Sequence, residues 1–109
     1  MECYERPTVT VKLVLLNNEM VFQWDDANRA EIARHDVTPE EVEQVFANKT
    51  WDLRPELVGD EEWYPSVGHT NRVRVIVVAW TMRGHAVRPI TAFEADLPLV
   101  KQYFAGRVL

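Results

Sequence analysis

Apolar residues follow a helical spacing in the first half of the chain, before residue 48. The clearest stripe has its members three and four positions apart: Val42, Val45 and Phe46. Thr38, followed by Pro39 and Glu41, matches the capping box that begins a helix. Asp25 is placed to cap a shorter helix that runs to about Arg34. Two helices are therefore predicted between residues 25 and 48.

A strand pattern replaces the helical spacing after residue 48. Four strands are predicted there: Trp51–Arg54, Glu62–Thr70, Arg74–Thr81 and Ala86–Ala92. The third is an almost continuous apolar run, which is typical of a central strand covered on both faces. Pro89 cannot donate to a strand ladder, so we expect the last strand to lie at an edge or to break there. Turns are expected at Asn71–Val73 and Met82–His85.

Further elements are predicted at both ends of the chain. Thr8–Leu16 is rich in strand formers, Asn17–Asn18 reads as a turn, and Met20–Trp24 is predicted as a second short strand. Near the other end, Asp96 is placed to cap a final helix that Gly106 is expected to stop. The apolar face of that helix is predicted to hold Leu97, Val100 and Phe104.

The order of these elements predicts an α+β fold. We expect an antiparallel sheet of four to five strands, with two N-terminal helices and one C-terminal helix packed on one of its faces. A length of 109 residues is that of one domain, so a single domain is expected over residues 1–109, with residues 1–19 as an N-terminal extension.

Composition removes several classes of protein from consideration. No apolar run reaches about 18 residues, so no membrane span is expected. The first residues lack the basic region and apolar core of a secretory signal. Cys3 is the only cysteine, which excludes an internal disulfide and a cysteine-based zinc cluster. The cytoplasm is the expected compartment, and neither a metal motif nor a cofactor fingerprint is present.

Charge is divided unequally along the chain, although the formal net charge is −5. Residues 1–64 hold 15 acidic and 6 basic residues, whereas residues 65–109 hold 2 acidic and 6 basic ones. No carboxylate lies between residues 65 and 92, which hold six basic side chains or imidazoles: His69, Arg72, Arg74, Arg83, His85 and Arg88. A field of one sign can steer an anion even on an acidic protein. The alternative is that these arginines pair with the acidic helices. Separately, the acidic run Gly59–Glu62 is expected to be a solvated loop.

Such a basic cluster could carry out RNA cleavage without a metal. That reaction needs a base for the 2′-hydroxyl, an acid for the departing 5′-oxygen and cations for the charge that develops on phosphorus. Arginine suits the last role because its fork matches two phosphate oxygens. His69 or His85 suits the others because an imidazole titrates near neutral pH, although a structural role is the alternative for each. Trp63 and Tyr64 point to opposite faces of their strand, and one of them could stack on a base, with packing as the alternative.

Two parts of the chain resemble the BrnT family of toxins. The first joins Phe22–Asn28 to Ile32–Phe46, which includes the His-Asp-Val-Thr-Pro-Glu-Glu segment. The second comprises five matches in order: Gly68–Thr70, Arg74 at the head of an apolar strand, Arg83–Gly84, Val87–Ala92 and Tyr103. Together they span residues 20–104, which we take as the BrnT-like region.

The resemblance implies a RelE-like fold and a toxin that slows translation by cutting RNA. It also implies a partner, a small DNA-binding antitoxin of the ribbon-helix-helix type, and multimeric complexes, so a homo-oligomer is an open possibility. By position, Arg74, Arg83, Arg88 and Tyr103 match residues of the family. We therefore expect three catalytic residues, His69, Arg74 and Arg88. Five further residues are expected to bind the RNA, with no metal or other cofactor: Arg72, Arg83, His85, Lys101 and Tyr103.

Departures from the family pattern leave other interpretations open. His69 stands where the family often has arginine, and Phe93 stands where it usually has another. Leu99–Val100 replaces a Glu-Arg pair, and Lys101 would restore the charge about 100° further round the helix. One alternative is therefore a catalytically inactive module that keeps the interface with an antitoxin-type partner, and another is a small-ligand or regulatory domain. The nuclease interpretation requires that the guanidinium groups gather on one solvent-facing surface.

Overall fold

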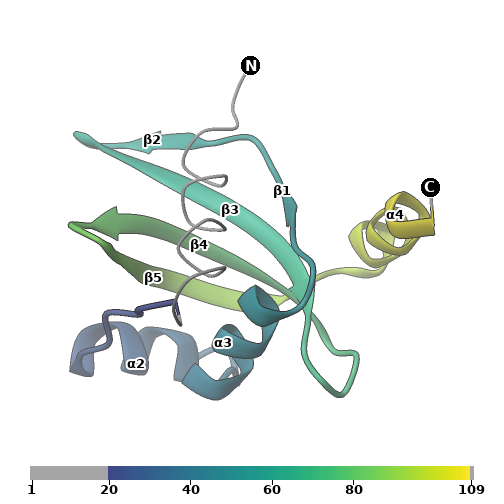
Figure 1. The fold of residues 1–109 in the computed structure, drawn as a ribbon, viewed down its shortest axis with the longest axis horizontal. Coiled ribbons are helices and arrows are strands. Elements are labelled where there is room, and N and C mark those ends of the chain that lie inside the picture. The colour runs from purple at the N-terminus through teal and green to yellow at the C-terminus, as the bar shows by residue number, and fades with distance from the viewer. Residues whose placement is uncertain (1–19, 109) are drawn as a thin grey trace.

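The computed structural model describes residues 20–108, which form an antiparallel sheet with helices on both sides (Figure 1). Eight elements follow one another: α2 (Asp26–Ala33), α3 (Pro39–Ala47), β1 (Trp51–Asp52), β2 (Glu56–Val58), β3 (Glu61–His69), β4 (Val75–Arg83), β5 (Ala86–Glu94) and α4 (Leu97–Val108). This order confirms the predicted α+β class. The predicted strand Thr8–Leu16 and the turn at Asn17–Asn18 lie outside the described residues.

Two long central strands, β3 and β4, organise the sheet. The strand order is β1-β3-β4-β5, and β2 pairs with the first residues of β3, on the same side as β1. The β4–β5 register shifts after Ala79, because Ala79 pairs with Thr91 whereas Trp80 pairs with Pro89. The bulge at Ile90 and the outer position of β5 accommodate a proline that cannot donate. The prediction for the last strand is therefore confirmed.

Strand β4 is buried on both of its faces, as its apolar run predicts. Its even-numbered residues Ile76, Val78 and Trp80 pack with α2 and α3. Val75 and Val77 pack on the opposite side, which we call the α4 face, with residues of α4. The prediction that all helices share one face is thus wrong for α4. The reason is that each buried valine or isoleucine is worth about 1.5–3 kcal/mol, so a strand that is apolar on both sides needs a cover on both.

Both N-terminal helices begin at the predicted caps. The Asp25 carboxylate accepts from the Asn28 amide at 3.1 Å, and the Asn28 side chain accepts in return from the Asp25 amide at 2.8 Å. Thr38 and Glu41 make the same reciprocal box at the start of α3. Asn28 is buried, and its side-chain amide also donates to the carbonyls of Gln23 and Pro89. These bonds hold α2 beside the outer edge of β5.

Short segments differ from the sequence prediction. Met20–Trp24 is not a strand, because within residues 20–108 it makes one parallel bridge, between Phe22 and Val87. Strand β2 was not predicted, and its Leu57 remains 73% exposed. The acidic run is a turn only at its first two residues, since Glu61 and Glu62 belong to β3. Each of these segments is too short for an apolar period to define it.

Helix α4 begins as predicted but differs in its face and its end. Asp96 caps it by accepting from the Leu99 amide at 3.1 Å. Leu97 is 63% exposed, whereas Tyr103 is 1% exposed and packs against the valines of the α4 face. The helix also continues through Gly106, which does not adopt a positive φ. With 12 residues it is the longest described helix, and no described helix is long and apolar enough to cross a bilayer.

The contact between β3 and α3 depends on Gly68. A Cβ atom at this position would lie 2.8 Å from Val45 Cγ1 and 3.3 Å from the Val45 carbonyl oxygen. We expect Gly68→Ala to lower the free energy of unfolding by about 1–3 kcal/mol, because backbone or helix must shift. Urea unfolding measures the change.

Gly106→Ala is the matched control for this substitution. A Cβ at Gly106 meets no atom within 4 Å, and the residue lies in a helix. It is expected to raise the stability by about 0.5–1 kcal/mol through the helix propensity of alanine. Equal urea midpoints for Gly68→Ala and the unaltered chain would contradict the close approach.

Candidate functional site

The predicted site residues lie at two opposite ends of the sheet. His69, Arg72 and Arg74 surround the β3–β4 turn, whereas Arg83 and His85 lie at the β4–β5 turn. A nine-residue strand separates these turns by about 30 Å. The prediction of one shared guanidinium surface is therefore wrong, because consecutive hairpin turns fall at opposite ends of the strand that they share.

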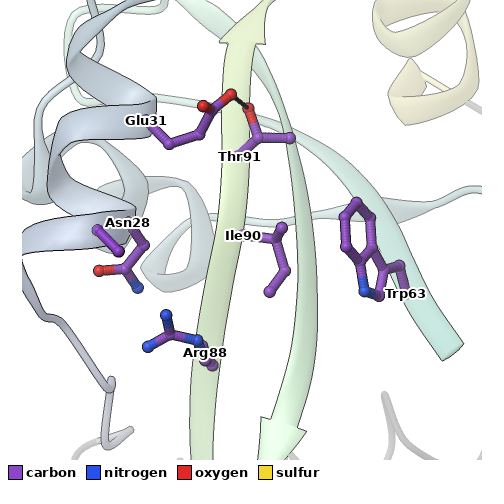
Figure 2. A pocket seen from close by; sticks show the side chains of 7 residues that line it. Asn28, Glu31, Trp63, Arg88, Ile90 and Thr91 are labelled. Carbon is purple, nitrogen blue, oxygen red and sulfur yellow. Dashed lines mark hydrogen bonds between the residues drawn. The ribbon is translucent and has the colours of Figure 1, made fainter. Parts of the chain in front are cut away.

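A cavity of about 440 Å³ lies beside β5, between α2 and β3 (Figure 2). Seven residues line it: Ala27, Asn28, Glu31, Trp63, Arg88, Ile90 and Thr91. Glu31 accepts a bond of 2.9 Å from the Thr91 hydroxyl, and this bond lowers the pKa of the Glu31 carboxyl. His35 Nε2 lies 3.3 Å from the same carboxylate oxygen. No motif in the sequence connects Glu31 with the residues of β5, so sequence reasoning missed it.

Arg88 and Arg83 pair with carboxylates that remain largely in contact with water. Arg88 Nη1 donates to Asp25 at 2.9 Å and to Gln23 at 3.1 Å, and Arg83 pairs with Glu61. These hydrogen bonds lower the pKa of Asp25 and of Glu61. The Asp25 side chain is 51% exposed. The Arg83 side chain is 41% exposed, and exposed ion pairs contribute little, so a phosphate can compete with Glu61 for it. The Arg88 side chain is only 16% exposed, so its pair with Asp25 is partly buried.

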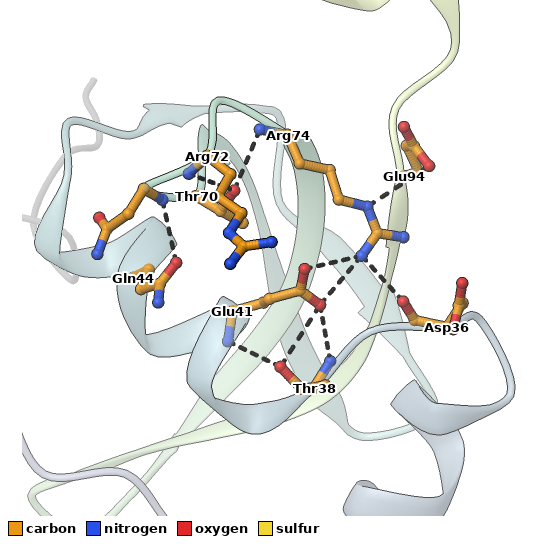
Figure 3. Close-up of polar contacts among 9 residues, drawn as sticks. Asp36, Thr38, Glu41, Gln44, Thr70, Arg72, Arg74 and Glu94 are labelled. Carbon is orange, nitrogen blue, oxygen red and sulfur yellow. Dashed lines mark hydrogen bonds and ion pairs between the residues drawn. The ribbon is translucent and has the colours of Figure 1, made fainter.

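Arg74 is held by a larger set of groups, as Figure 3 shows. Its Nη1 donates to both carboxylate oxygens of Glu41 at 3.0 Å and to the Asp36 carbonyl at 2.9 Å. Its Nε lies 3.5 Å from a Glu94 oxygen. Only 23% of the Arg74 side chain is exposed. This geometry favours a structural role for Arg74, which joins α3 and the preceding loop to β5, over the predicted catalytic one.

The Glu41 carboxyl has a pKa below its ordinary value of 4.5. Burial raises this pKa, but hydrogen bonds from the Thr38 amide and from Arg74 outweigh burial and lower it. The folded chain therefore binds a proton at Glu41 less readily than the unfolded chain does. This difference makes the stability depend on pH.

We expect the stability that Glu41 supplies to be present above pH 4.5 and to fade as the pH falls through its lower folded pKa. The difference in free energy of unfolding between the unaltered chain and Glu41→Gln should therefore be larger at about pH 7 than at about pH 3. Urea unfolding at both pH values measures it. Glu40→Gln, on the exposed neighbour, should change the stability by less than about 0.5 kcal/mol. A difference for Glu41→Gln that is independent of pH would contradict the assignment.

The imidazole of His69 is oriented by a chain of hydrogen bonds. Its Nδ1 lies 2.8 Å from the Tyr103 hydroxyl, which donates to the Lys49 carbonyl at 2.9 Å. A carbonyl only accepts and a hydroxyl has one proton, so the Tyr103 oxygen must accept from Nδ1–H. The neutral tautomer of His69 therefore carries its proton on Nδ1, and Nε2 is the basic nitrogen. Tyr103, predicted to bind RNA, is buried and positions His69.

The remaining candidates are exposed. Arg72 lies in the β3–β4 turn, where it lines a polar cavity of about 660 Å³ with Arg74 and Glu41 (Figure 3). Arg72 makes no ion pair with another described residue. Lys101 is exposed on α4, and His85 is exposed in the β4–β5 turn. Of the basic residues in this half of the chain, Arg72 lies nearest to His69 in the sequence.

The departures from the family pattern noted above converge on the α4 face. His69 pairs with Val75 across the sheet, and Phe93 pairs with Val77. Leu99 and Val100 pack against the cluster that contains these two valines. An apolar surface with one imidazole at its end therefore occupies the place where charged residues were expected.

Comparison with known proteins gives one family. A family model described as "Ribonuclease toxin, BrnT, of type II toxin-antitoxin system" matches residues 24–96. The matched region includes His69, Arg74 and Arg88 and ends before α4. No curated protein matches the chain. Among residues 20–108, no cluster of three or more His, Cys, Asp or Glu side chains is placed to hold a metal ion.

Proposed function

The chain belongs to the BrnT family of ribonuclease toxins of type II toxin–antitoxin systems, and from this premise we propose that it cleaves RNA with His69 as the general base and without a metal ion. This proposal does not depend on the shared arginine surface that the structure overturns, because it assigns removal of the proton to His69. One observation carries the proposal. The bonds from His69 to Tyr103 and from Tyr103 to Lys49 fix both the orientation and the tautomer of the imidazole. A base held in this way needs no reorganisation before it takes a proton.

The proposed reaction is an intramolecular transesterification. His69 Nε2 takes the proton of the 2′-hydroxyl, and the 2′-oxygen forms a bond to phosphorus. The bond from phosphorus to the 5′-oxygen breaks, and this oxygen takes a proton from water or from a neighbouring acid. The products are a 2′,3′-cyclic phosphate and a 5′-hydroxyl. Lys101, on the helix that also supplies Tyr103 to His69, stabilises the charge on phosphorus, and Arg72 binds the RNA strand from the β3–β4 turn.

The remaining cations are assigned to binding of the RNA strand. Arg88 pairs with Thr81 across the sheet and therefore lies on the α4 face, as His69 does. Arg83 and His85 extend this track at the far end of β4. Glu61 is a weak competitor for a phosphodiester at Arg83, whose side chain is 41% exposed. The partner that neutralises the toxin is proposed to be a small DNA-binding antitoxin of the ribbon-helix-helix type.

A second candidate function is binding to the antitoxin without catalysis. Two observations favour it: carboxylates engage Arg74, Arg83 and Arg88, and apolar residues replace charged ones at Phe93 and Leu99–Val100. Each lost charge near the phosphate would remove about 2–4 kcal/mol of transition-state stabilisation. In that case the fold would persist for its interface alone.

Cleavage of RNA by the purified chain in EDTA separates these two functions. The proposed ribonuclease should cut single-stranded RNA to 2′,3′-cyclic phosphate ends in EDTA, and expression of the chain alone should slow bacterial growth. Asp60→Asn, an exposed turn residue outside the site, is the matched control and should cleave at the same rate. Intact RNA and normal growth, with a folded chain that still binds the antitoxin, would establish the second function instead.

A further inference from the structure

The cavity beside β5 combines three chemical features in one space. Figure 2 shows Arg88 at one end of it and the Glu31–Thr91 pair at the other, with Ile90 between them and Trp63 across from β5. Its volume of about 440 Å³ is within the range of sites for small ligands. The cavity presents in order a cation, an apolar middle with an aromatic wall, and a carboxylate. These groups complement in turn the phosphate, the face of the base and the donor edge of the base in a nucleotide.

The Arg88 end is suited to a phosphate. A guanidinium has five N–H donors, and Asp25 and Gln23 engage only Nη1 and Nη2. The Nε–H donor of Arg88 has no partner among the described residues. The Arg88 side chain is 16% exposed, so its charge is less screened by water than that of Asp25. A phosphate can therefore bind at the Nε–H donor while Arg88 keeps its ion pair with Asp25.

Trp63 provides the wall for a base. Its indole Nε1 donates to Glu61 at 3.1 Å, which fixes the ring in the cavity wall. Ile90 and Ala27 are apolar lining residues, so a flat ring is desolvated on both sides. Stacking of a base on an aromatic side chain changes affinity by about tenfold or more and is tolerant of sequence. Selection among bases must then come from a polar group at the far end.

Glu31 is that polar group. Its Oε1 accepts from Arg34 and its Oε2 from Thr91, and His35 Nε2 lies 3.3 Å from Oε2. Each carboxylate oxygen can accept two bonds, so a second donor on Oε2 takes the place of the long His35 contact. Guanine presents two adjacent donors, the ring N1–H and the exocyclic amino group, which match a carboxylate. Adenine presents one donor beside a ring acceptor, and that acceptor would face the negative charge. Glu31 therefore discriminates in favour of guanine.

We propose that this cavity is a guanine-selective nucleotide subsite, with the phosphate on Arg88, the base on Trp63 and its donor edge on Glu31. The inference rests on the proposed function in so far as the ligand is part of an RNA strand. Trp63 and His69 lie on the same face of β3 and are six positions apart, which places the subsite about 20 Å from His69, the proposed general base. The subsite thus reads a nucleotide away from the bond that is cut.

Binding of mononucleotides to the whole chain tests the subsite without any cleavage. We would titrate the protein with GMP, AMP and UMP and follow the four tryptophan indole N–H signals by NMR. Trp63→Phe identifies the Trp63 signal, and Trp51→Phe, at an exposed tryptophan of β1, is the matched control. GMP should shift the Trp63 signal and bind at least about tenfold more tightly than AMP.

Glu31→Gln tests the source of the selectivity. This variant should lose about tenfold in affinity for GMP and little for AMP, because the amide presents a donor where guanine needs an acceptor. Asp60→Asn, which removes an exposed carboxylate elsewhere, should bind both nucleotides as the unaltered chain does. Equal affinities for GMP and AMP, or a Trp63 signal that no nucleotide shifts, would overturn the proposal.

Two results keep this inference separate from the proposed ribonuclease. Selective GMP binding by a chain that leaves RNA intact in EDTA would support the subsite and remove the catalytic function. Cleavage of RNA by a chain that binds no nucleotide in the cavity would do the reverse. A urea unfolding curve for each variant shows that the comparison is between folded proteins.

Discussion

Replacing Arg74 by alanine is expected to lower the free energy of unfolding by about 2–3 kcal/mol. The reason is the number of groups that depend on it. Its guanidinium satisfies both oxygens of Glu41, the carbonyl of Asp36 and one oxygen of Glu94. Without it, Glu41 remains a half-buried carboxylate with fewer partners. Chemical unfolding in urea at about pH 7 measures the loss.

Two variants sharpen this test. Arg74→Lys keeps the charge but loses the planar fork, so it should retain most of the destabilisation. Arg83→Ala, at an exposed ion pair, should change the stability by less than about 1 kcal/mol. If Arg74→Ala and Arg83→Ala have the same urea midpoint, Arg74 has no special structural role.

Local features of this fold could be predicted from the sequence. The predicted N-caps at Asp25 and Thr38 were correct because the amide that each side chain caps lies three residues away and nothing distant is needed. The prediction that β4 is covered on both faces was correct because a continuous apolar run is typical of such a strand. The turn predicted at Met82–His85 was correct at Gly84 and His85, because Gly84 adopts the positive φ that glycine permits, whereas Met82 and Arg83 belong to β4.

Contacts between distant parts of the chain could not be predicted in the same way. A segment without carboxylates suggested unpaired arginines, yet the carboxylates reach them from elsewhere in the sequence. Arg74 meets Glu41 across 33 positions, and Arg88 meets Asp25 across 63. The alternative that these arginines pair with the acidic helices is therefore confirmed for Arg74, whose partner lies in α3, whereas the partner of Arg88 is the residue that caps α2. Charge along a sequence does not specify charge on a surface, because the fold decides which side chains meet.

The candidate site shows the same limit. The family resemblance drew attention to His69, but its orientation depends on Tyr103, 34 positions later. Tyr103 is buried because α4 turns a different face to the sheet from the one that its apolar spacing indicated. A helix with Leu97, Leu99, Val100, Tyr103 and Phe104 has apolar residues on more than one side. The sheet beneath it selects which of them are buried.

His69→Ala is expected to lower the rate of RNA cleavage by about 10²–10⁴-fold, the usual contribution of a general base. Tyr103→Phe should lower the rate less, because the imidazole remains but loses the acceptor that fixes its tautomer. It should also lower the free energy of unfolding by about 1–3 kcal/mol, because the Lys49 carbonyl loses its buried donor. Single-turnover cleavage of a short RNA in EDTA, across a range of pH, measures the rates.

The pH profile separates a base from a merely structural histidine. A general base makes the rate rise with pH until it is deprotonated, so His69→Ala should lose this rise as well as the rate. Tyr64→Phe, which removes a phenol oxygen that donates to Glu62 at the other end of β3, is the matched control for Tyr103→Phe and should keep the full rate and profile. If His69→Ala is folded and its profile has the same shape as that of the unaltered chain, another group takes the proton. A rate in Tyr103→Phe equal to that of the unaltered chain would show that the hydrogen-bond chain does not position the base.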